Sequence, residues 1–426
     1  MAFPRMLRLR QTFAAQRVDD IPAETERQLA RLQLGEKVKP GASVAISAGS
    51  RGIANIARVI KAVVDHFRRL GAQPFVVPAM GSHGGGTAEG QRQIIEGYGV
   101  TEAYLGVPIR ASMETVIVDK TPHGIPVHFD KHAFSADHVV VCGRIKPHTG
   151  FVGDIESGLH KMMLIGLGKH EGAKIYHRAI MDHSWPEIVL SVAQSVLKKC
   201  KVVCGVGIVE NAYDETALIE AVRPEEFYAR EVELLKLARQ WLPRLPFPKT
   251  DLLIVDEIGK NILGTGMDTN VIGRKFNDHR ATDRDDVSCR IVFVRGLTEE
   301  THGNATGIGL AEFTNQRTID AVDRKITAIN CITGGHPTAA MLPIAFETDR
   351  EVLENALTQI GLTEPEQARI VQIQDTLHLA EVLVSEAYLP EIRSRKDLEI
   401  LEGPFAMPLD EQGNLRPVGG KHGNRN

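Results

Sequence analysis

Histidine is concentrated in one part of this 426-residue sequence. Nine of the sixteen histidines lie between His123 and His183. Histidine is the usual neutral ligand of nickel, zinc and copper, and the usual proton carrier near neutral pH. Three short segments in and before this region each follow an expected strand. We interpret them as active-site loops, because doubly wound sheets bind ligands at the carboxyl ends of their strands.

The first two segments are rich in glycine. Residues 48–52 allow a tight turn whose amides attract anions, and Arg51 offers a planar fork for a carboxylate or phosphate. Residues 79–86 place four glycines around His83, so that backbone and substrate can approach the ring closely. An ordinary strand–helix turn and an inert loop histidine are the alternative interpretations.

The third segment, residues 144–177, contains most of the reactive side chains. His148 follows a proline, and His160 and Lys161 stand directly before the apolar run MMLIGLG. Lysines on helices usually face solvent, but an apolar neighbourhood favours a nucleophilic amine. Lys161 is therefore a candidate for covalent chemistry.

Together these segments resemble the nickel-dependent lactate racemase family. In that family a lysine carries a nicotinic-acid-derived pincer cofactor as a covalent thioamide, and a histidine sixteen residues later ligates the nickel, which matches Lys161 and His177. Two further family histidines act as paired acid–bases, in a Gly-x-His loop and a Pro-His pair, which match His83 and His148. The family's arginine for the substrate carboxylate matches Arg51.

The resemblance implies an isomerase, a racemase or epimerase of a 2-hydroxy acid. Its cofactor would be the nickel-pincer nucleotide, the nickel complex of pyridinium-3,5-bisthiocarboxylic acid mononucleotide. Transient oxidation to a planar keto acid avoids removal of a weakly acidic α-proton. A base is needed for the hydroxyl proton of each configuration, which is the reason for two histidines, His83 and His148. The implied partners are the small-molecule substrate and the cofactor-biosynthesis proteins.

Several details depart from the family pattern. Gly158-Leu159-His160 stands where Gly-Gly-Arg is common, and a glycine instead of an arginine follows His83. The first loop lacks the usual aspartate, and the distance from His148 to Lys161 is longer than in the lactate enzymes. These changes favour a hydroxy acid larger than lactate. An aldonate 2-epimerase with the same cofactor and a non-catalytic nickel- or cofactor-binding homologue therefore stay open. A zinc hydrolase is disfavoured, because no helical His-x-x-x-His pair with a nearby glutamate is present.

Alternating strands and helices must position these side chains. A helix with an apolar face is expected at residues 53–70, and apolar strands are expected at 43–47, 73–78, 114–118, 138–142 and 201–209. This order predicts an α/β fold with mainly parallel sheets flanked by helices. Three prolines within residues 242–249 indicate a linker, after which the pattern restarts.

We therefore expect two α/β domains with the active site in the cleft between them. Residues 1–245 would form the N-terminal cofactor- and substrate-binding domain and residues 250–390 a smaller C-terminal domain, followed by an extension at 391–426.

Composition excludes several classes of protein. A net charge of −4 provides no basic field for nucleic acid or anionic lipid. The five cysteines form no CxxC pair, which argues against a disulfide framework or a cysteine-rich metal site. No apolar run approaches the roughly 18 residues of a membrane helix, and no signal-peptide core is present. We expect a cytoplasmic protein without nucleic-acid or membrane partners, and homo-oligomerisation stays open.

Overall fold

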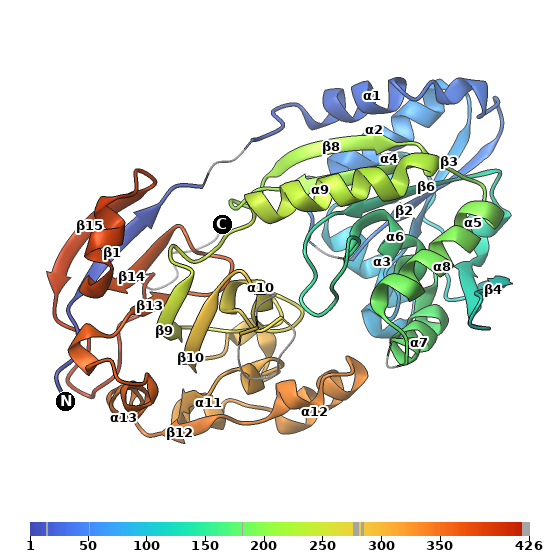
Figure 1. The fold of residues 1–426 in the computed structure, drawn as a ribbon. Coiled ribbons are helices and arrows are strands. Elements are labelled where there is room, and N and C mark those ends of the chain that lie inside the picture. The colour runs from blue at the N-terminus through green and yellow to red at the C-terminus, as the bar shows by residue number, and fades with distance from the viewer. Residues whose placement is uncertain (14–15, 51, 181, 276–280, 283–284, 420–426) are drawn as a thin grey trace. The chain divides into compact units, whose positions relative to one another are not determined.

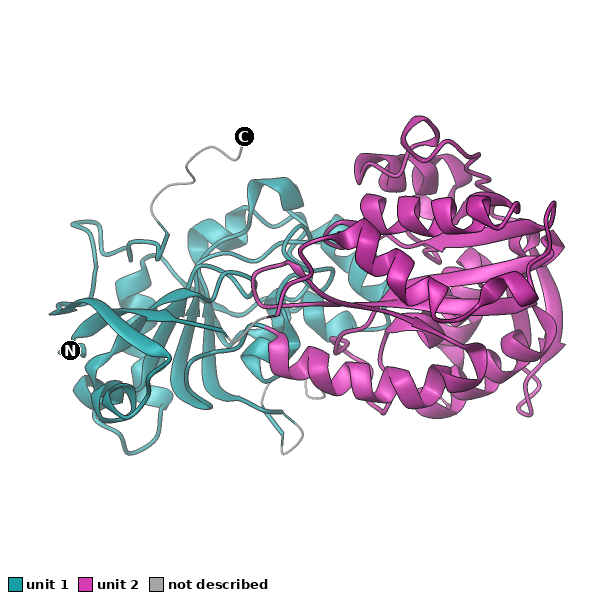
Figure 2. Ribbon diagram, turned by 90° about the horizontal axis from the view of Figure 1, so that it is seen from above, with its two compact units in different colours: residues 1–14, 243–426 teal, residues 15–242 magenta. Residues whose placement is uncertain are grey.

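The computed structural model describes residues 1–13, 16–50, 52–180, 182–275, 281–282 and 285–419 (Figure 1). The chain divides into two compact units, one of residues 15–242 and the other of residues 1–14 with 243–426 (Figure 2). Each unit contains a β-sheet with parallel strands and flanking helices, so the predicted α/β class is confirmed. None of the helices in the described part of the chain combines the length and apolar character needed to cross a membrane.

The unit of residues 15–242 is built on a five-stranded sheet. The strand order is β3 (Gln73–Pro78), β2 (Ser43–Ala48), β6 (His138–Arg144), β7 (Val202–Glu210) and β8 (Thr216–Val222). The first four strands are parallel, and β8 is antiparallel to β7. The expected strands at 43–47, 73–78, 138–142 and 201–209 all lie in this sheet.

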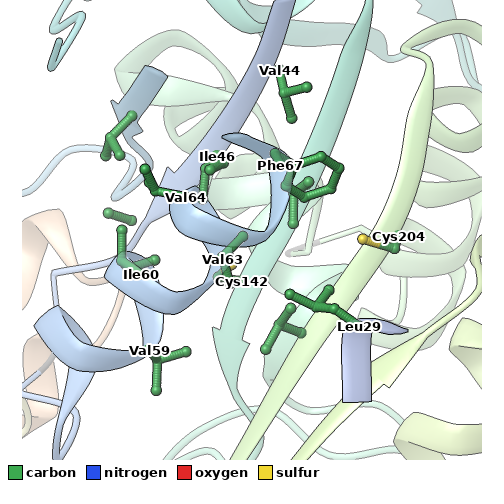
Figure 3. Packing of buried hydrophobic residues seen from close by; sticks show 14 of the residues in the cluster. Leu29, Val44, Ile46, Val59, Ile60, Val63, Val64, Phe67, Cys142 and Cys204 are labelled. Carbon is green, nitrogen blue, oxygen red and sulfur yellow. The ribbon is translucent and has the colours of Figure 1, made fainter. Parts of the chain in front are cut away.

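Apolar side chains cover both faces of the sheet. On one face, α1 (Ile21–Ala30) and α2 (Ile56–Arg69) pack onto β2, β6 and β7, where Phe67, Ile46 and Val44 are fully buried (Figure 3). Burying each such side chain contributes about 1.5–3 kcal/mol. All five cysteines are likewise buried.

The opposite face carries a second apolar cluster. It is formed by the π-helical turn η3 (Met162–Gly166), α8 (Trp185–Lys199) and the hairpin of β4 (Thr115–Lys120) and β5 (Pro126–Asp130). The remaining helices of this unit are α3 (Ala88–Gly97), α4 (Glu102–Leu105), α5 (Lys131–Ser135), α6 (Gly158–Lys161), α7 (Lys169–Ala179) and α9 (Phe227–Trp241).

Strand order fixes where a ligand site is expected. The chain passes from β2 to β3 on one side and later returns to β6 on the other side of β2. The carboxyl ends of β2 and β6 therefore form the point at which the strand order reverses. Open α/β sheets bind ligands in the crevice at such a point.

The other unit contains an eight-stranded sheet. Its order is β12 (Ile344–Phe346), β11 (Phe313–Asn315), β10 (Ser288–Val294), β9 (Lys249–Val255), β13 (Ile370–Ile373), β14 (Glu381–Ser385), β1 (Met6–Gln11) and β15 (Leu398–Phe405). The first five strands are parallel and the last three antiparallel. Its helices are α10 (Thr269–Ile272), α11 (Gln316–Asp320), α12 (Arg324–Thr333), α13 (Asp349–Ala356) and α14 (Leu389–Arg393).

The predicted boundaries at 1–245, 250–390 and 391–426 differ from these units at both ends of the chain. Strand β1 belongs to the second sheet, between β14 and β15, because Leu7 and Leu9 are buried while Arg8 and Arg10 lie beside acidic residues of the neighbouring strands. This two-residue alternation is visible in the sequence MLRLRQ but is short. Residues 398–405 are likewise a sheet strand and not an extension.

Buried polar side chains also hold the C-terminal segment. Asp256 accepts a hydrogen bond from the amide of Val418 at 2.8 Å, and Asp349 accepts one from the amide of Leu415 at 2.9 Å. Both aspartates are buried and both pair with Arg295. Beside them, a cavity of about 470 Å³ opens at the carboxyl ends of β9 and β10.

Candidate active site

Three loops meet at the carboxyl ends of adjacent strands. They follow β2, β3 and β6, and they are the segments in which the sequence predicted reactive side chains. The Ser50 hydroxyl hydrogen-bonds Nδ1 of His83, which joins the first two loops. The Tyr98 hydroxyl donates to the Ser50 carbonyl at 2.9 Å. Arg51, the predicted carboxylate ligand, lies outside the described residues.

Two buried residues, Gln91 and Lys169, hold the backbone of the His83 loop in place. The Gln91 amide donates to the carbonyl oxygens of Gly81 at 2.8 Å and His83 at 3.3 Å. Lys169 in turn donates to Gln91 Oε1 at 2.9 Å and to the Pro78 carbonyl at 2.7 Å. Burial lowers the pKa of Lys169, and Asp130, whose carboxylate lies 3.5 Å away, opposes that shift. The predicted loop histidine is thus fixed through its backbone.

Glycine is required at Gly81. Its φ of +61° lies in the left-handed region, and a Cβ there would stand 2.9 Å from Cγ2 of Ile165. The turn η3, which follows Lys161, therefore packs directly against this loop. Met162 of the same turn would stand 3.0 Å from a Cβ at Gly49, so η3 also supports the loop after β2.

Phe151 brings three predicted site residues together. The His148 ring stacks on Phe151 with centroids 4.1 Å apart and an angle of 8° between the planes. Nζ of Lys161 lies 5.2 Å from the Phe151 centroid, and the His177 ring lies 6.2 Å from it. Trp185 stacks on Phe151 at 4.0 Å. Lys161 and His177 are sixteen positions apart in the sequence, but both reach the same aromatic side chain.

Sequence reasoning assigned no role to Phe151 or Trp185. The available signal was weak: Phe151 lies three residues after His148, and Trp185 begins a helix that is capped by Ser184. The indole of Trp185 donates to the Ile155 carbonyl at 2.7 Å, so it is anchored to the loop that carries His148.

Buried polar groups also hold the His148 loop. The main-chain amide of His148 donates to Glu156 Oε2 at 2.9 Å, and Arg239 donates to Glu156 Oε1 at 2.7 Å. Ser157 accepts from the Lys146 amide at 2.8 Å and donates to the Lys146 carbonyl at 2.6 Å. These bonds close the segment between β6 and α6 into a fixed loop.

His160, which departs from the family pattern, pairs with a glutamate of α9. Its Nδ1 lies 2.5 Å from Glu231 Oε2, and both side chains are almost fully buried. Burial raises the pKa of Glu231, and its hydrogen bond with His160 partly opposes that shift. Glu231 Oε1 has no hydrogen-bond partner within the described structure. A Cβ at Gly158 would stand 2.1 Å from this oxygen, so the pair requires glycine there.

The structure thus defines a doubly wound α/β domain with histidines and a lysine gathered at its strand-order switch. Residues 15–187 match the family model of the lactate racemase N-terminal domain. The resemblance to the lactate racemase family that the sequence motifs indicated is therefore confirmed for this part of the chain. The matched domain supports an activity of the racemase or epimerase type.

Two solved structures are similar to the chain. The lactate racemase apoprotein from Thermoanaerobacterium thermosaccharolyticum is 13% identical, with a TM-score of 0.50 over 93% of each chain. A Thermotoga maritima protein is 12% identical, with a TM-score of 0.48 over 75% of this chain and 81% of that one. At 13% identity, the similarity to the lactate racemase apoprotein shows only that the fold is shared. No curated protein matches the sequence.

Proposed function

We propose that this protein is a racemase or epimerase of a 2-hydroxy acid that works with the nickel-pincer nucleotide. The observation that carries the proposal is the position of His148, Lys161 and His177 around Phe151, on loops and helices that follow β6. The same strand ends bring His83 next to Ser50. A proton carrier, an amine and an imidazole are thereby available at one edge of the sheet.

The donor set is compatible with this cofactor. Lys161 would attach the organic group through its amine, and His177 would give the nickel an imidazole ligand, which suits that metal. No three His, Cys, Asp or Glu side chains among the described residues are arranged to hold a metal ion. The bisthiocarboxylic acid carries its own sulfur donors, so one protein imidazole is sufficient. When bound, the cofactor supplies the two-electron redox step at the α-carbon.

The protein's own residues would move the proton and orient the substrate. In the proposal, His83 and His148 serve the substrate hydroxyl, and a positioned histidine contributes about 10² to 10⁴ in rate as an acid–base. Arg51 would bind the carboxylate through two hydrogen bonds. The stacked rings of Phe151 and Trp185 would keep water away from Lys161.

The wider setting also belongs to the proposal. The cofactor is made by other proteins, so this chain would depend on cofactor-biosynthesis partners. We place it in the cytoplasm with a small-molecule substrate. Because several residues of these loops depart from the family pattern, an aldonate is the second substrate class to be tested beside small 2-hydroxy acids.

Co-expression with pincer-biosynthesis enzymes tests the proposal. We expect the purified protein to gain the mass of the cofactor and to contain nickel. It should then isomerise at least one enantiomer from a panel of 2-hydroxy acids and aldonates, followed by chiral chromatography. Protein expressed without those enzymes is the control and should be inactive. A loaded protein that isomerises no member of the panel would contradict the proposed activity and favour a cofactor-binding role.

A further inference from the structure

We infer that Arg144 and Glu210 are positioning residues for substrate binding, because together they hold the loop between β2 and α2 (residues 49–55). This inference rests on the proposed function, which assigns the substrate carboxylate to Arg51 of that loop. Neither Arg144 nor Glu210 needs to touch the substrate or the cofactor. They act through the loop backbone that follows Arg51.

The two residues end adjacent strands of the sheet. Arg144 is the last residue of β6, and Glu210 is the last residue of β7. Side chains alternate between the faces of a strand, so Arg144 shares a face with Cys142, and Glu210 with Ile208. Cys142 and Ile208 belong to the apolar cluster that α1 and α2 cover. The charged pair therefore lies at the edge of this cluster, on the side of the sheet from which α2 begins.

Glu210 and Arg144 both bind the loop and each other. Oε1 of Glu210 accepts from the Ala54 amide at 2.6 Å, and Oε2 pairs with NH1 of Arg144. The same NH1 group donates to the Gly52 carbonyl at 3.4 Å. One N–H and one C=O group of the loop are thus bound by charged side chains, and hydrogen bonds with an ionised partner are stronger than neutral ones.

Burial makes each member of the pair depend on the other. The side chain of Glu210 is 8% exposed and that of Arg144 is 15% exposed. A charge shielded from water is costly unless it is paired, so the two side chains keep one another in place. Thr216, the buried first residue of β8, donates to the Ala54 carbonyl at 3.0 Å and accepts from the Asn55 side chain at 3.1 Å. The end of the loop that leads into α2 is therefore fixed from three strands.

The other end of the loop is fixed at Ser50. Its hydroxyl hydrogen-bonds His83, and its carbonyl accepts from Tyr98 at 2.9 Å. In the sequence, Arg51 stands between this anchor and Gly52. A misplacement of about 1 Å in a binding group can cost about 10²-fold in rate, so an arginine that binds a carboxylate needs such anchors on both sides.

The role predicts a specific kinetic effect. The carboxylate is common to both configurations of the substrate, whereas the hydroxyl points in different directions in the two. Loosening the loop should therefore raise KM for both enantiomers by the same factor. Because the contact to the carboxylate is made before and during the reaction alike, kcat should change little.

Hydrogen exchange of the full-length protein without cofactor tests whether the pair holds the loop. Glu210→Gln keeps the size of the side chain and an oxygen for Ala54, but it turns an amide donor toward Arg144. We expect exchange in residues 49–55 to become about tenfold faster, as for the loss of one charge-assisted hydrogen bond. Glu220→Gln is the matched control: Glu220 is 13% exposed and pairs with Arg230 of α9 at 2.7 Å. Unchanged exchange of the loop in folded Glu210→Gln would overturn the inference.

Kinetics of the loaded enzyme then test the role in binding. We expect Glu210→Gln to raise KM about tenfold for both enantiomers and Glu220→Gln to leave KM unchanged. Arg144→Lys should stay within about threefold of the wild-type KM, because only NH1 makes these contacts and an ammonium can replace a single donor group. A lower kcat at unchanged KM, or a higher KM for one enantiomer alone, would contradict the role.

The two measurements keep this inference apart from the proposed function. If loaded wild-type protein isomerises no substrate, the proposed function fails, and the role in substrate binding fails with it. Hydrogen exchange needs neither cofactor nor substrate and still decides whether the pair holds the loop. The two failures are therefore distinguishable.

Discussion

The buried ammonium group of Lys169 donates to Gln91 Oε1 at 2.9 Å, and through Gln91 it reaches the loop of His83. Lys169 has a φ of +56°, a left-handed conformation that is uncommon outside glycine. It is the first residue of α7, the helix that follows η3 and carries His177. The same residue thus begins the helix that carries His177 and supports the loop that carries a proposed acid–base.

Gln91→Leu should loosen the His83 loop. The substitution removes the donor to the Gly81 carbonyl and one of the acceptors of the Lys169 ammonium, and each unsatisfied buried group costs about 1–3 kcal/mol. We expect a lower Tm and a lower kcat. The dependence of activity on the amount of nickel loaded should stay largely unchanged. Gln93→Leu on the same helix is the control, because Gln93 is exposed and its side chain donates to Glu89. Equal effects of the two substitutions would argue against support through Gln91.

Lys161→Ala should abolish any covalent mass increment when the cofactor is loaded. The Lys161 side chain is only half-buried, so the fold and its circular dichroism should be unchanged. Intact-mass spectrometry provides the measurement. Lys174→Ala is the matched control, since Lys174 is exposed on α7 and pairs with Glu171. A full increment on Lys161→Ala would place the attachment at another residue.

His177→Ala should lose nickel but keep the organic part of the cofactor. Its imidazole is the proposed metal ligand, whereas attachment is assigned to Lys161. Nickel analysis combined with the mass of the intact protein separates the two parts. His123→Ala removes an exposed histidine that pairs with His183, and it should retain full nickel. Unchanged nickel in His177→Ala would shift the assignment to His160 or His170.

Glu231→Gln should change how stability depends on pH. Burial raises the pKa of the Glu231 carboxyl above its ordinary value of 4.5, so the folded chain holds the proton more tightly than the unfolded chain. Stability from this group is present at low pH and is lost as pH rises through the raised pKa. The free energy of unfolding of the variant should therefore increase relative to that of the wild type as pH rises above 4.5.

Urea unfolding at a series of pH values measures this difference. Glu233→Gln on the same helix is the control: its carboxyl is exposed and bonds Lys236, which lowers its pKa. That variant should not show the gain. A Glu231→Gln variant that loses stability relative to wild type with rising pH would show that the buried carboxyl prefers its charged form beside His160.

Much of the framework follows from local patterns. The strands at 43–48 and 73–78 and the helix that follows the first of them are visible as apolar runs with the correct periods. Parallel strands end at one edge of a sheet, so loops after such strands come together without further information. For this reason the sequence alone was sufficient to group the loops of His83 and His148.

The sequence did not locate every element correctly. The helix expected from residue 53 begins at Ile56, because residues 53–55 form a turn that ends with Asn55 in a left-handed conformation. Asp349 is the first residue of α13, but Thr348 caps the helix, and Asp349 binds Arg295 and Arg317. Local propensity determined where the helix begins. The buried partners of Asp349 determined that Thr348, and not Asp349, caps it.

What the sequence determined by itself was the class of fold, the three loops and the spacing of Lys161 and His177. Only the tertiary structure decided the pairing of His160 with Glu231, 71 positions later, and the placing of β1 beside β15. It also decided which backbone amides meet Nδ1 of His148, because that depends on where the amides of Gly150 and Phe151 point after the loop has closed on Glu156. Such contacts depend on orientation and burial, and neither can be read from residue type and spacing.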